Sequence, residues 1–336
     1  MWNRRFRLFI VPPMKALITG ASGFLGGRLA QVLAASTGFV RILARPSNDL
    51  SHLANLPIEV VEGTLSDQNV LTQATQGITH IFHCAAASTD WAPWETYFKA
   101  NVEGTRNLLE AAKSARDLER FLHISTTDVY GYPKQVCDES TPPRDAGLPY
   151  NRTKILGEQA ALDSGLPVTV IRPATIYGPR SVTFGTDLAK LLRQRLMAVI
   201  DHGHAPGGFL YVDNAVDAIL LAATSKNSVN RIYNLSDGTG VTWKTFVDQL
   251  ADGLGYPRPW IDLPSSAAFA LARFLEAPHL YLKAPGRPLL TRHAVYLLAR
   301  DQEFPIGRIR RELGYQPSIS FEEGMARTIQ WLKTRT

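Results

Sequence analysis

Lys15-Ala-Leu-Ile-Thr-Gly-Ala-Ser-Gly-Phe-Leu-Gly-Gly27 is the stretch that decides the fold of this 336-residue chain. The apolar run at 16–18 predicts a buried strand, and the periodicity of 24–35 predicts a helix. Glycines at GxxGxxG spacing join them; such glycines turn the chain, let the backbone approach a pyrophosphate and let the helix pack closely. The helix N-terminus then offers unpaired N–H groups to the phosphates. The stretch predicts a dinucleotide site formed by Gly20, Ser22, Gly23, Phe24, Leu25 and Gly26.

The composition is that of a globular protein, with 45% hydrophobic and 20% charged residues. Three arginines within residues 1–13, a segment without acids, supply half of the net charge of +6. Nucleic acid is therefore not expected as a partner, and residues 1–13 are expected to be a loose extension. Two cysteines without CxxC spacing predict neither a disulfide framework nor a metal site, so we expect a reducing, cytoplasmic location. The sequence contains no apolar run of the ~20 residues that a transmembrane helix needs.

Strand-like runs alternate with helical segments through the first half of the chain. This order predicts an α/β fold with a doubly wound parallel (Rossmann) sheet. The expected strands, after the first, are 39–44, 58–63, 78–84, 120–125 and 167–172. Runs at 209–213 and 231–235 are expected to rejoin this sheet, and 173–179 to form a loop followed by a helix at 186–198.

Proline breaks and helical patterns dominate the C-terminal part, which predicts a smaller, mostly helical substrate lobe. We expect a dinucleotide-binding domain at 14–172, to which 209–235 returns. The substrate lobe then comprises 173–208 and 236–336. Trp91 and the aromatic residues near it, with the apolar segment 267–282, favour a hydrophobic substrate, although aromatic residues at such spacing also form cores. The 267–300 region alternatively docks at a membrane surface or a partner.

The end of the second strand bears on the choice of cofactor. In nicotinamide-binding folds an acid at this place binds the adenosine ribose and selects NAD, whereas here Ala44 is followed by Arg45. A guanidinium there matches a 2′-phosphate and favours NADP; the alternative is a solvated arginine in a loop. The small residues after the fourth strand, Ala85 and Ala86 among them, would let the cofactor lie close to the backbone.

Tyr150-Asn-Arg-Thr-Lys154 is the second informative stretch. Residues four apart on a helix share a face, so the Lys154 ammonium is expected beside the Tyr150 phenol. Such a charge at about 4 Å is worth ~1 kcal/mol in water and ~4 kcal/mol at intermediate dielectric. We therefore expect the pKa of Tyr150 to fall from about 10 toward neutrality, which would make the phenol a usable acid or base. Ser125 and Thr126 close the fifth strand, where a hydroxyl either binds a substrate oxygen or only satisfies the local backbone.

These motifs resemble the extended short-chain dehydrogenase/reductases, of the NAD(P)-dependent epimerase/dehydratase superfamily, over about residues 14–335. The resemblance rests on Thr19–Gly26, Asn101–Thr105, the Thr126/Tyr150/Lys154 set and Arg172–Pro179. It implies that Thr126 is the catalytic hydroxyl, that Tyr150 is the acid/base, and that Lys154 tunes Tyr150 and binds the nicotinamide ribose. Asn101 either supports the active site or is a buried polar residue satisfied by backbone.

The resemblance also implies contacts beyond these four residues. Further cofactor contacts are expected at Thr64, Leu65 and Pro173, and substrate contacts at Ser125, Trp91, Thr175 and Tyr177. One departure is that Thr64 stands where many relatives carry an adenine-binding Asp, so carboxylate contact with adenine is in doubt. His202 and His204 lack further clustered ligands, so no metal is expected.

The Arg45-Pro-Ser and Arg-Pro-x-x-Ile-Tyr-Gly-Pro elements look most like the 3β-hydroxysteroid dehydrogenase and dihydroflavonol reductase branch. The chain is therefore expected to be an NADP(H)-dependent oxidoreductase, with NAD possible, that interconverts a secondary alcohol and a ketone. Steroid-, flavonoid- or 3-oxo-acid-like substrates are expected. The alternatives are a nucleotide-sugar epimerase or dehydratase with tightly bound NAD, and a non-catalytic dinucleotide-binding scaffold. Helices near 101–115 and 150–163 resemble those that form a homodimer interface in the family.

Overall fold

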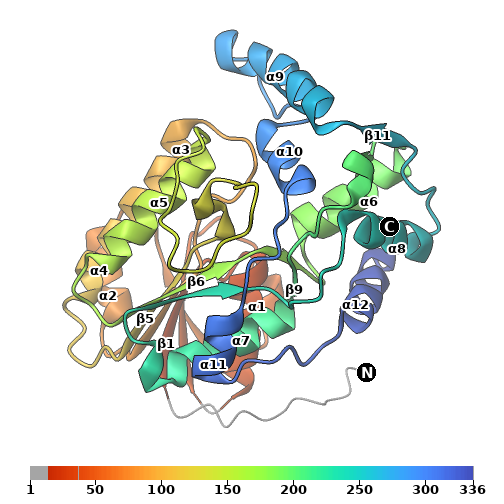
Figure 1. Cartoon of the computed structure of the whole chain (residues 1–336). Coiled ribbons are helices and arrows are strands. Elements are labelled where there is room, and N and C mark those ends of the chain that lie inside the picture. The colour runs from red at the N-terminus through yellow and green to blue at the C-terminus, as the bar shows by residue number, and fades with distance from the viewer. Residues whose placement is uncertain (1–13, 37, 336) are drawn as a thin grey trace.

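A computed structural model describes residues 14–36 and 38–335; the N-terminal extension at 1–13 lies outside the described residues. Its centre is a seven-stranded parallel sheet of order β10-β6-β5-β4-β1-β2-β3 (Figure 1). The strands are β1 (Lys15–Thr19), β2 (Phe39–Ala44), β3 (Ile58–Glu62), β4 (His80–His83), β5 (Arg120–Ile124), β6 (Val168–Pro173) and β10 (Arg231–Leu235). The predicted sheet is confirmed, and its strands lie within two residues of the expected bounds.

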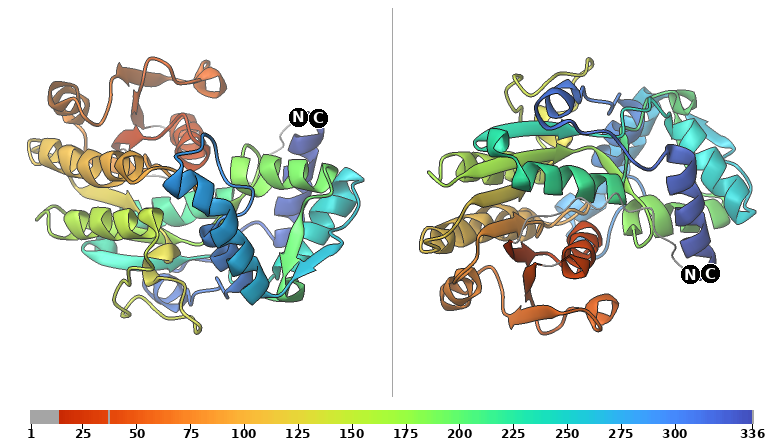
Figure 2. Two further views of the ribbon diagram at one scale, coloured as in Figure 1. Left: turned by 90° about the horizontal axis from the view of Figure 1, so that it is seen from above. Right: turned by 90° about the horizontal axis from the view of Figure 1, so that it is seen from below.

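Helices cover both faces of the sheet (Figure 2). One face carries α2 (Gln68–Thr75), α4 (Gly104–Ala112) and α5 (Pro149–Leu162), and the other carries α1 (Phe24–Ala35), α7 (Val212–Thr224) and α11 (Gly307–Leu313). Each face has its own core of fully buried aliphatic side chains, because a parallel strand buried on both sides needs apolar residues throughout. The predicted doubly wound Rossmann fold is therefore present.

The strand order reverses beside β1, since β2 and β3 lie on one side of it and β4, β5 and β6 on the other. Connections leave β1 and β4 in opposite directions at such a point, which opens a crevice at their carboxyl ends. Gly20 ends β1 with φ +76°, and a Cβ there would lie 2.7 Å from the Ala85 backbone nitrogen. Only glycine fits this position, because it combines a left-handed conformation with a close backbone approach.

One sequence prediction about the sheet is wrong. The stretch 209–213 does not rejoin the main sheet; β9 (Phe209–Tyr211) pairs with β7 (Thr175–Tyr177), inside the predicted loop at 173–179. The reason is that both edges of β6 are occupied, by β5 and by β10. The returning strand β10 does pair with β6 as expected.

The C-terminal part is mostly helical, as predicted. Its elements are α6 (Leu188–Arg193), β8 (Ala198–Ile200), α8 (Trp243–Leu254), β11 (Ile261–Leu263), α9 (Ser265–Tyr281), α10 (Arg292–Ala299) and α12 (Phe321–Lys333). The helix expected at 186–198 is shorter, because a π-helical turn (Val182–Asp187) precedes α6 and 198 begins β8. A separate aromatic core holds this region together, with Phe209 stacked on Phe246 at 4.1 Å between ring centroids. None of the helices within 14–36 and 38–335 is long and apolar enough to cross a bilayer.

Candidate active site

A cavity of about 1040 Å³ lies at the carboxyl ends of the central strands. It is bounded by the glycine turn after β1, the ends of β2, β4 and β5, the start of α5, and residues of α10. Most residues predicted for the site line it: Gly20, Ser22, Gly23, Phe24, Leu25, Gly26, Arg45, Thr64, Leu65, Ala85, Ala86, Ser125, Thr126, Tyr150, Lys154, Pro173 and Thr175.

The floor of the cavity fits a dinucleotide. The Cβ of any other residue at position 26 would collide with the Gly20 carbonyl, so the turn and the first turn of α1 stay in close contact. The first N–H groups of α1 therefore remain directed at the space where a pyrophosphate would lie. The glycine turn thus has the shape that the sequence predicts for a phosphate site.

At the far end of this floor, Arg45 is exposed and lines the cavity. Its backbone N–H donates to Asn48 Oδ1 at 3.0 Å, which fixes the turn after β2. Its guanidinium has no hydrogen-bond or ion-pair partner within the described part of the chain. Thr64 also lines the cavity, and its hydroxyl accepts from the Ser66 N–H at 3.2 Å.

The predicted Tyr/Lys pair stands on α5. Pro149 occupies the first turn of that helix, where a missing N–H costs nothing. Lys154 is buried, and its Nζ donates to the Ile124 carbonyl at 2.7 Å, which ties α5 to the end of β5. Burial lowers the pKa of Lys154 to about 8, although Glu158, Cys84 and Asp128 favour its charged form.

The expected acidification of Tyr150 is not found. Burial, and then the negative charge of Asp128, hold the pKa of Tyr150 above its usual value, and the hydrogen bond with Thr126 opposes them. Lys154 is not among the groups that shift this pKa, because its ammonium points at the Ile124 carbonyl. In this structure the phenol is therefore a proton donor at neutral pH.

Two residues of the site were missed from the sequence. His293, on α10, is 5% exposed and lies over the Tyr150 ring at 5.3 Å between centroids and 23° between planes. Its Nε2 lies 3.0 Å from Asp128 Oδ2, and both residues line the cavity. Asp128 could have been predicted from the sequence, because it lies two residues beyond Thr126. His293 could not, because only the packing of α10 brings it to the site.

Asn101 does not line the cavity but fixes one of its walls. Its Oδ1 accepts from the Ala87 N–H at 2.8 Å, and its Nδ2 donates to Thr153 Oγ1 at 3.2 Å. The side chain thereby connects the loop after β4 with α5, while its backbone forms part of a π-helical turn (Lys99–Glu103). These partners fit both predicted roles of Asn101. Its side chain is a buried polar group bonded largely to backbone, and the same bonds support the wall of the site.

Ser125 lines the cavity but has a partner of its own, because its hydroxyl donates to Glu158 Oε2 at 2.5 Å. Trp91 and Tyr177 lie outside the cavity lining. Trp91 packs edge-on against His279, with 5.8 Å between ring centroids. Tyr177 is fully buried in the aromatic core and its hydroxyl donates to the Phe321 carbonyl, so the expected substrate contact is wrong for this residue. Its motif leads into β7, where Thr175 and Ile176 line the cavity while the Tyr177 side chain packs in the aromatic core.

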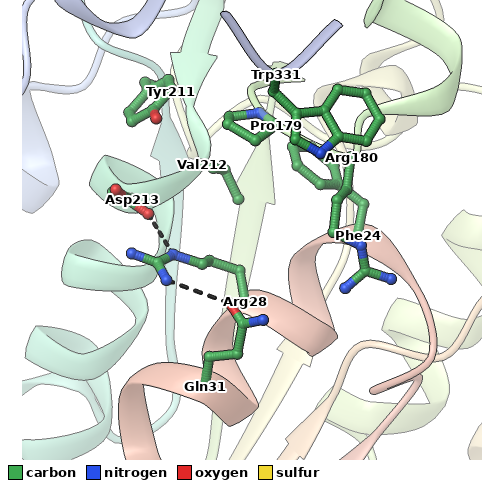
Figure 3. A pocket seen from close by; sticks show the side chains of 9 residues that line it. All are labelled: Phe24, Arg28, Gln31, Pro179, Arg180, Tyr211, Val212, Asp213 and Trp331. Carbon is green, nitrogen blue, oxygen red and sulfur yellow. Dashed lines mark hydrogen bonds and ion pairs between the residues drawn. The ribbon is translucent and has the colours of Figure 1, made fainter. Parts of the chain in front are cut away.

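A smaller pocket of about 250 Å³ lies between α1, α7 and α12 (Figure 3). Arg28 donates to Asp213 Oδ1 at 2.6 Å and to Gln31 Oε1 at 3.2 Å, so these facing groups satisfy one another. Phe24 lines both this pocket and the large cavity. None of the residues predicted for catalysis lies here, and the large cavity is the candidate active site.

Comparison with known proteins agrees with this geometry. Residues 16–236 match the model of the NAD dependent epimerase/dehydratase family. A 4-hydroxy-2-methyl-3-oxo-4-farnesyl-3,4-dihydroquinoline-1-oxide ketoreductase from Stigmatella aurantiaca is 31% identical over 93% of this chain and 95% of its own. A 2-alkyl-3-oxoalkanoate reductase from Stenotrophomonas maltophilia is 30% identical, covering 94% and 98%.

Two further similarities extend the range of relatives. The human sterol-4-alpha-carboxylate 3-dehydrogenase, decarboxylating, is 27% identical over 94% of this chain and 87% of its own. The solved structure of MoeE5 in complex with UDP-glucose and NAD superposes with a TM-score of 0.73, at 25% identity, covering 96% and 99%.

Proposed function

Since the chain belongs to the NAD dependent epimerase/dehydratase family and is an NAD(P)-dependent oxidoreductase, we propose that it interconverts a secondary alcohol and a ketone on a hydrophobic substrate. The observation that carries the proposal is the convergence of Thr126, Tyr150 and Lys154 on one cavity, above a glycine turn that fits a dinucleotide. Relatives named as reductases or dehydrogenases of oxo and hydroxy compounds support the same reaction class.

We propose NADP as the preferred cofactor, with Arg45 binding the 2′-phosphate. Arg45 at the end of β2 is exposed, and its guanidinium has no partner among the residues that the structure describes, which supports this assignment. Gly20, Gly23 and the first turn of α1 would hold the pyrophosphate, and Lys154 the nicotinamide ribose. When bound, the nicotinamide ring supplies or accepts the hydride.

The proton chemistry belongs to the chain itself. Thr126 and Tyr150 would hold the substrate oxygen between two hydroxyl groups, and the Tyr150 hydroxyl would give that oxygen its proton during reduction. The raised pKa of Tyr150 keeps the phenol protonated, as an acid must be. In the oxidative direction Tyr150 must first lose this proton, so we expect alcohol oxidation to need a higher pH than ketone reduction.

Apolar residues in the cavity lining support the proposal of an apolar substrate. They include Ile176, Val182, Phe184 and Leu297. The relatives' names suggest a ketone near a carboxylate or within a prenylated ring as the class to test first. We further propose a cytoplasmic homodimer formed through α4 and α5, which light scattering would check.

The test is NADPH consumption with steroid, flavonoid and 3-oxo-acid ketones. We expect turnover with at least one class, and Tyr150→Phe should lower kcat by about 10²–10⁴-fold, because the substrate oxygen loses its proton donor. Tyr281→Phe, at an exposed tyrosine outside the cavity, is the matched control and should change little. Absence of turnover with NADPH and NADH across all three classes, or an unchanged Tyr150→Phe rate, would contradict the proposal.

A nucleotide-sugar epimerase or dehydratase is the second candidate, because MoeE5 shares the fold and was crystallised with UDP-glucose and NAD. It predicts NAD that copurifies with the protein and a rise in Tm with UDP- or GDP-sugars. Failure of both would exclude it.

A further inference from the structure

The second half of α9 and the loop after it expose an unusual number of large apolar side chains. Six of the thirteen exposed large hydrophobic side chains in the described residues fall within 271–289. We call these six the apolar ridge: Leu271, Phe274, Leu280, Tyr281, Leu282 and Leu289. Phe274 is 75% exposed, Tyr281 82% and Leu282 79%. Scattered apolar residues are ordinary on a protein surface, but a group this exposed on one helix and the loop after it indicates an interaction site.

The ridge follows from how α9 packs. Ala268, Ala272 and Glu276 recur every four residues and form the buried stripe toward the body of the molecule. Leu271, Phe274 and Tyr281 lie away from this stripe, and the described part of the chain leaves them exposed. The helix projects from one end of the molecule, at the top of Figure 1. Both faces of α9 are therefore apolar, and the fold covers only one.

Among the described residues, the charges of α9 and the following loop that lack an ion-pair partner are positive. Glu276 is the only acid within 264–291, and it is buried against Arg292. Arg273 and Lys283 are exposed and have no ion-pair partner among residues 14–36 and 38–335. A twofold contact between two copies of the ridge would bring these cations together, which argues against self-association. An apolar stripe flanked by free cations matches the interface of an anionic bilayer.

The helix and loop that carry the ridge also contact the wall of the active-site cavity. In the loop after α9, Arg287 donates to Asp90 Oδ2 at 2.6 Å, and Thr291 donates to the same oxygen at 2.9 Å. Asp90 lines the cavity, and its neighbour Trp91 packs on His279 of α9. A surface bound to the ridge would therefore lie next to one wall of the cavity.

We propose that α9 and the following loop dock on membranes that contain anionic phospholipids, with the apolar ridge inserted at headgroup level. Docking needs neither cofactor nor turnover, so it can be tested separately from the proposed reaction. It would bring an apolar substrate dissolved in the bilayer to the cavity, and this consequence rests on the proposed function.

The test is cosedimentation of the full chain with vesicles of phosphatidylcholine plus phosphatidylglycerol, and with phosphatidylcholine alone. We expect binding to the anionic vesicles, weaker binding to the neutral ones, and weakening by salt. The double variant Phe274→Glu/Tyr281→Glu should bind at least about tenfold more weakly, because two inserted rings become charged. Lys283→Glu should weaken binding to anionic vesicles only.

Val60→Glu is the matched control, since it charges an exposed apolar residue on the edge strand β3, and it should bind like the wild type. An unchanged Tm of the double variant would show that it folds. Three results would overturn the proposal: no vesicle binding by the wild-type chain, undiminished binding by the double variant, or loss of a wild-type dimer in the double variant without vesicle binding.

Discussion

Arg45 is the residue on which the choice between NADP and NAD depends. Its backbone is fixed by Asn48, while its guanidinium has no partner within 14–36 and 38–335, so it can pair with a phosphate without breaking a contact described there. An arginine–phosphate pair contributes about 1.5–3 kcal/mol, which corresponds to a factor of about 10–100.

Arg45→Ala should therefore lower kcat/KM with NADPH by about 10–100-fold and leave NADH almost unaffected, because only NADPH carries the 2′-phosphate. Steady-state kinetics with both dinucleotides measures this. Arg116→Ala is the control for lost positive charge, because Arg116 is an exposed arginine in the loop before β5, at the amino ends of the strands and away from the cavity. An equal loss with both dinucleotides would show that Arg45 serves the turn rather than the phosphate.

His293 and Asp128 set the electrostatics around the phenol. The Asp128 charge raises the pKa of Tyr150, and the His293 Nε2 lies 3.0 Å from this carboxylate. His293→Phe keeps a ring over Tyr150 but removes the donor, so the unpaired carboxylate should raise the pKa further. Asp128→Asn removes the charge and should lower it.

The pH profile of alcohol oxidation reports this change. The midpoint of its rising limb should move to higher pH by about one unit in His293→Phe and to lower pH in Asp128→Asn. A shift of one unit corresponds to about 1.4 kcal/mol. The double variant should behave like Asp128→Asn, since no charge then remains to be paired. A rising limb that stays in place in His293→Phe would argue against this role.

At the scale of elements, the position of α5 depends on close packing against the π-helical turn at Lys99–Glu103. A Cβ at Gly157 would collide with the Asn101 carbonyl, so the two segments can approach only through a glycine. From the other side, Glu158 forms a buried ion pair with Arg172 and accepts from Ser125. The helix that carries Tyr150 and Lys154 is thus held on both sides.

Gly157→Ala should lower the free energy of unfolding by about 1–3 kcal/mol, because overpacking outweighs the gain of up to about 1 kcal/mol in helix propensity. Urea unfolding measures the loss. Gly185→Ala makes the same change where the nearest atom would be 3.6 Å away, an ordinary contact, and should be neutral or stabilising. Equal stabilities of the two variants would mean that the contact with Asn101 relaxes at no cost.

Elements with strong local signals were predictable from the sequence. The glycine turn follows from the spacing of its glycines, and α1 and the parallel strands follow from periodicity. β7 and the π-helical turns were missed, and β9 was predicted as a strand but assigned to the wrong sheet, because these features are fixed by which sheet edges and helix faces remain free. The prediction of a lowered pKa for Tyr150 was wrong for a similar reason. The spacing placed Lys154 on the same helix face as Tyr150, but it could not show that the Lys154 ammonium binds the Ile124 carbonyl.

At the scale of the whole molecule, the site is assembled from parts far apart in the sequence. β1, β2, β4 and β5 supply the floor, α5 the phenol and ammonium, and α10 the histidine that covers the phenol. The division into a dinucleotide-binding domain and a substrate lobe remains a prediction. It assigns the floor to one part and His293 to the other, so substrate would meet the phenol where the two parts join.

Transfer of deuterium from NADPH that carries deuterium at both C4 positions of the nicotinamide tests the central claim most directly. Mass spectrometry of the alcohol formed from an accepted ketone should find one deuterium on the carbinol carbon, and Tyr150→Phe should form almost none of this product. An unlabelled product, or labelled product formed equally fast by Tyr150→Phe, would contradict hydride transfer with Tyr150 as the proton donor.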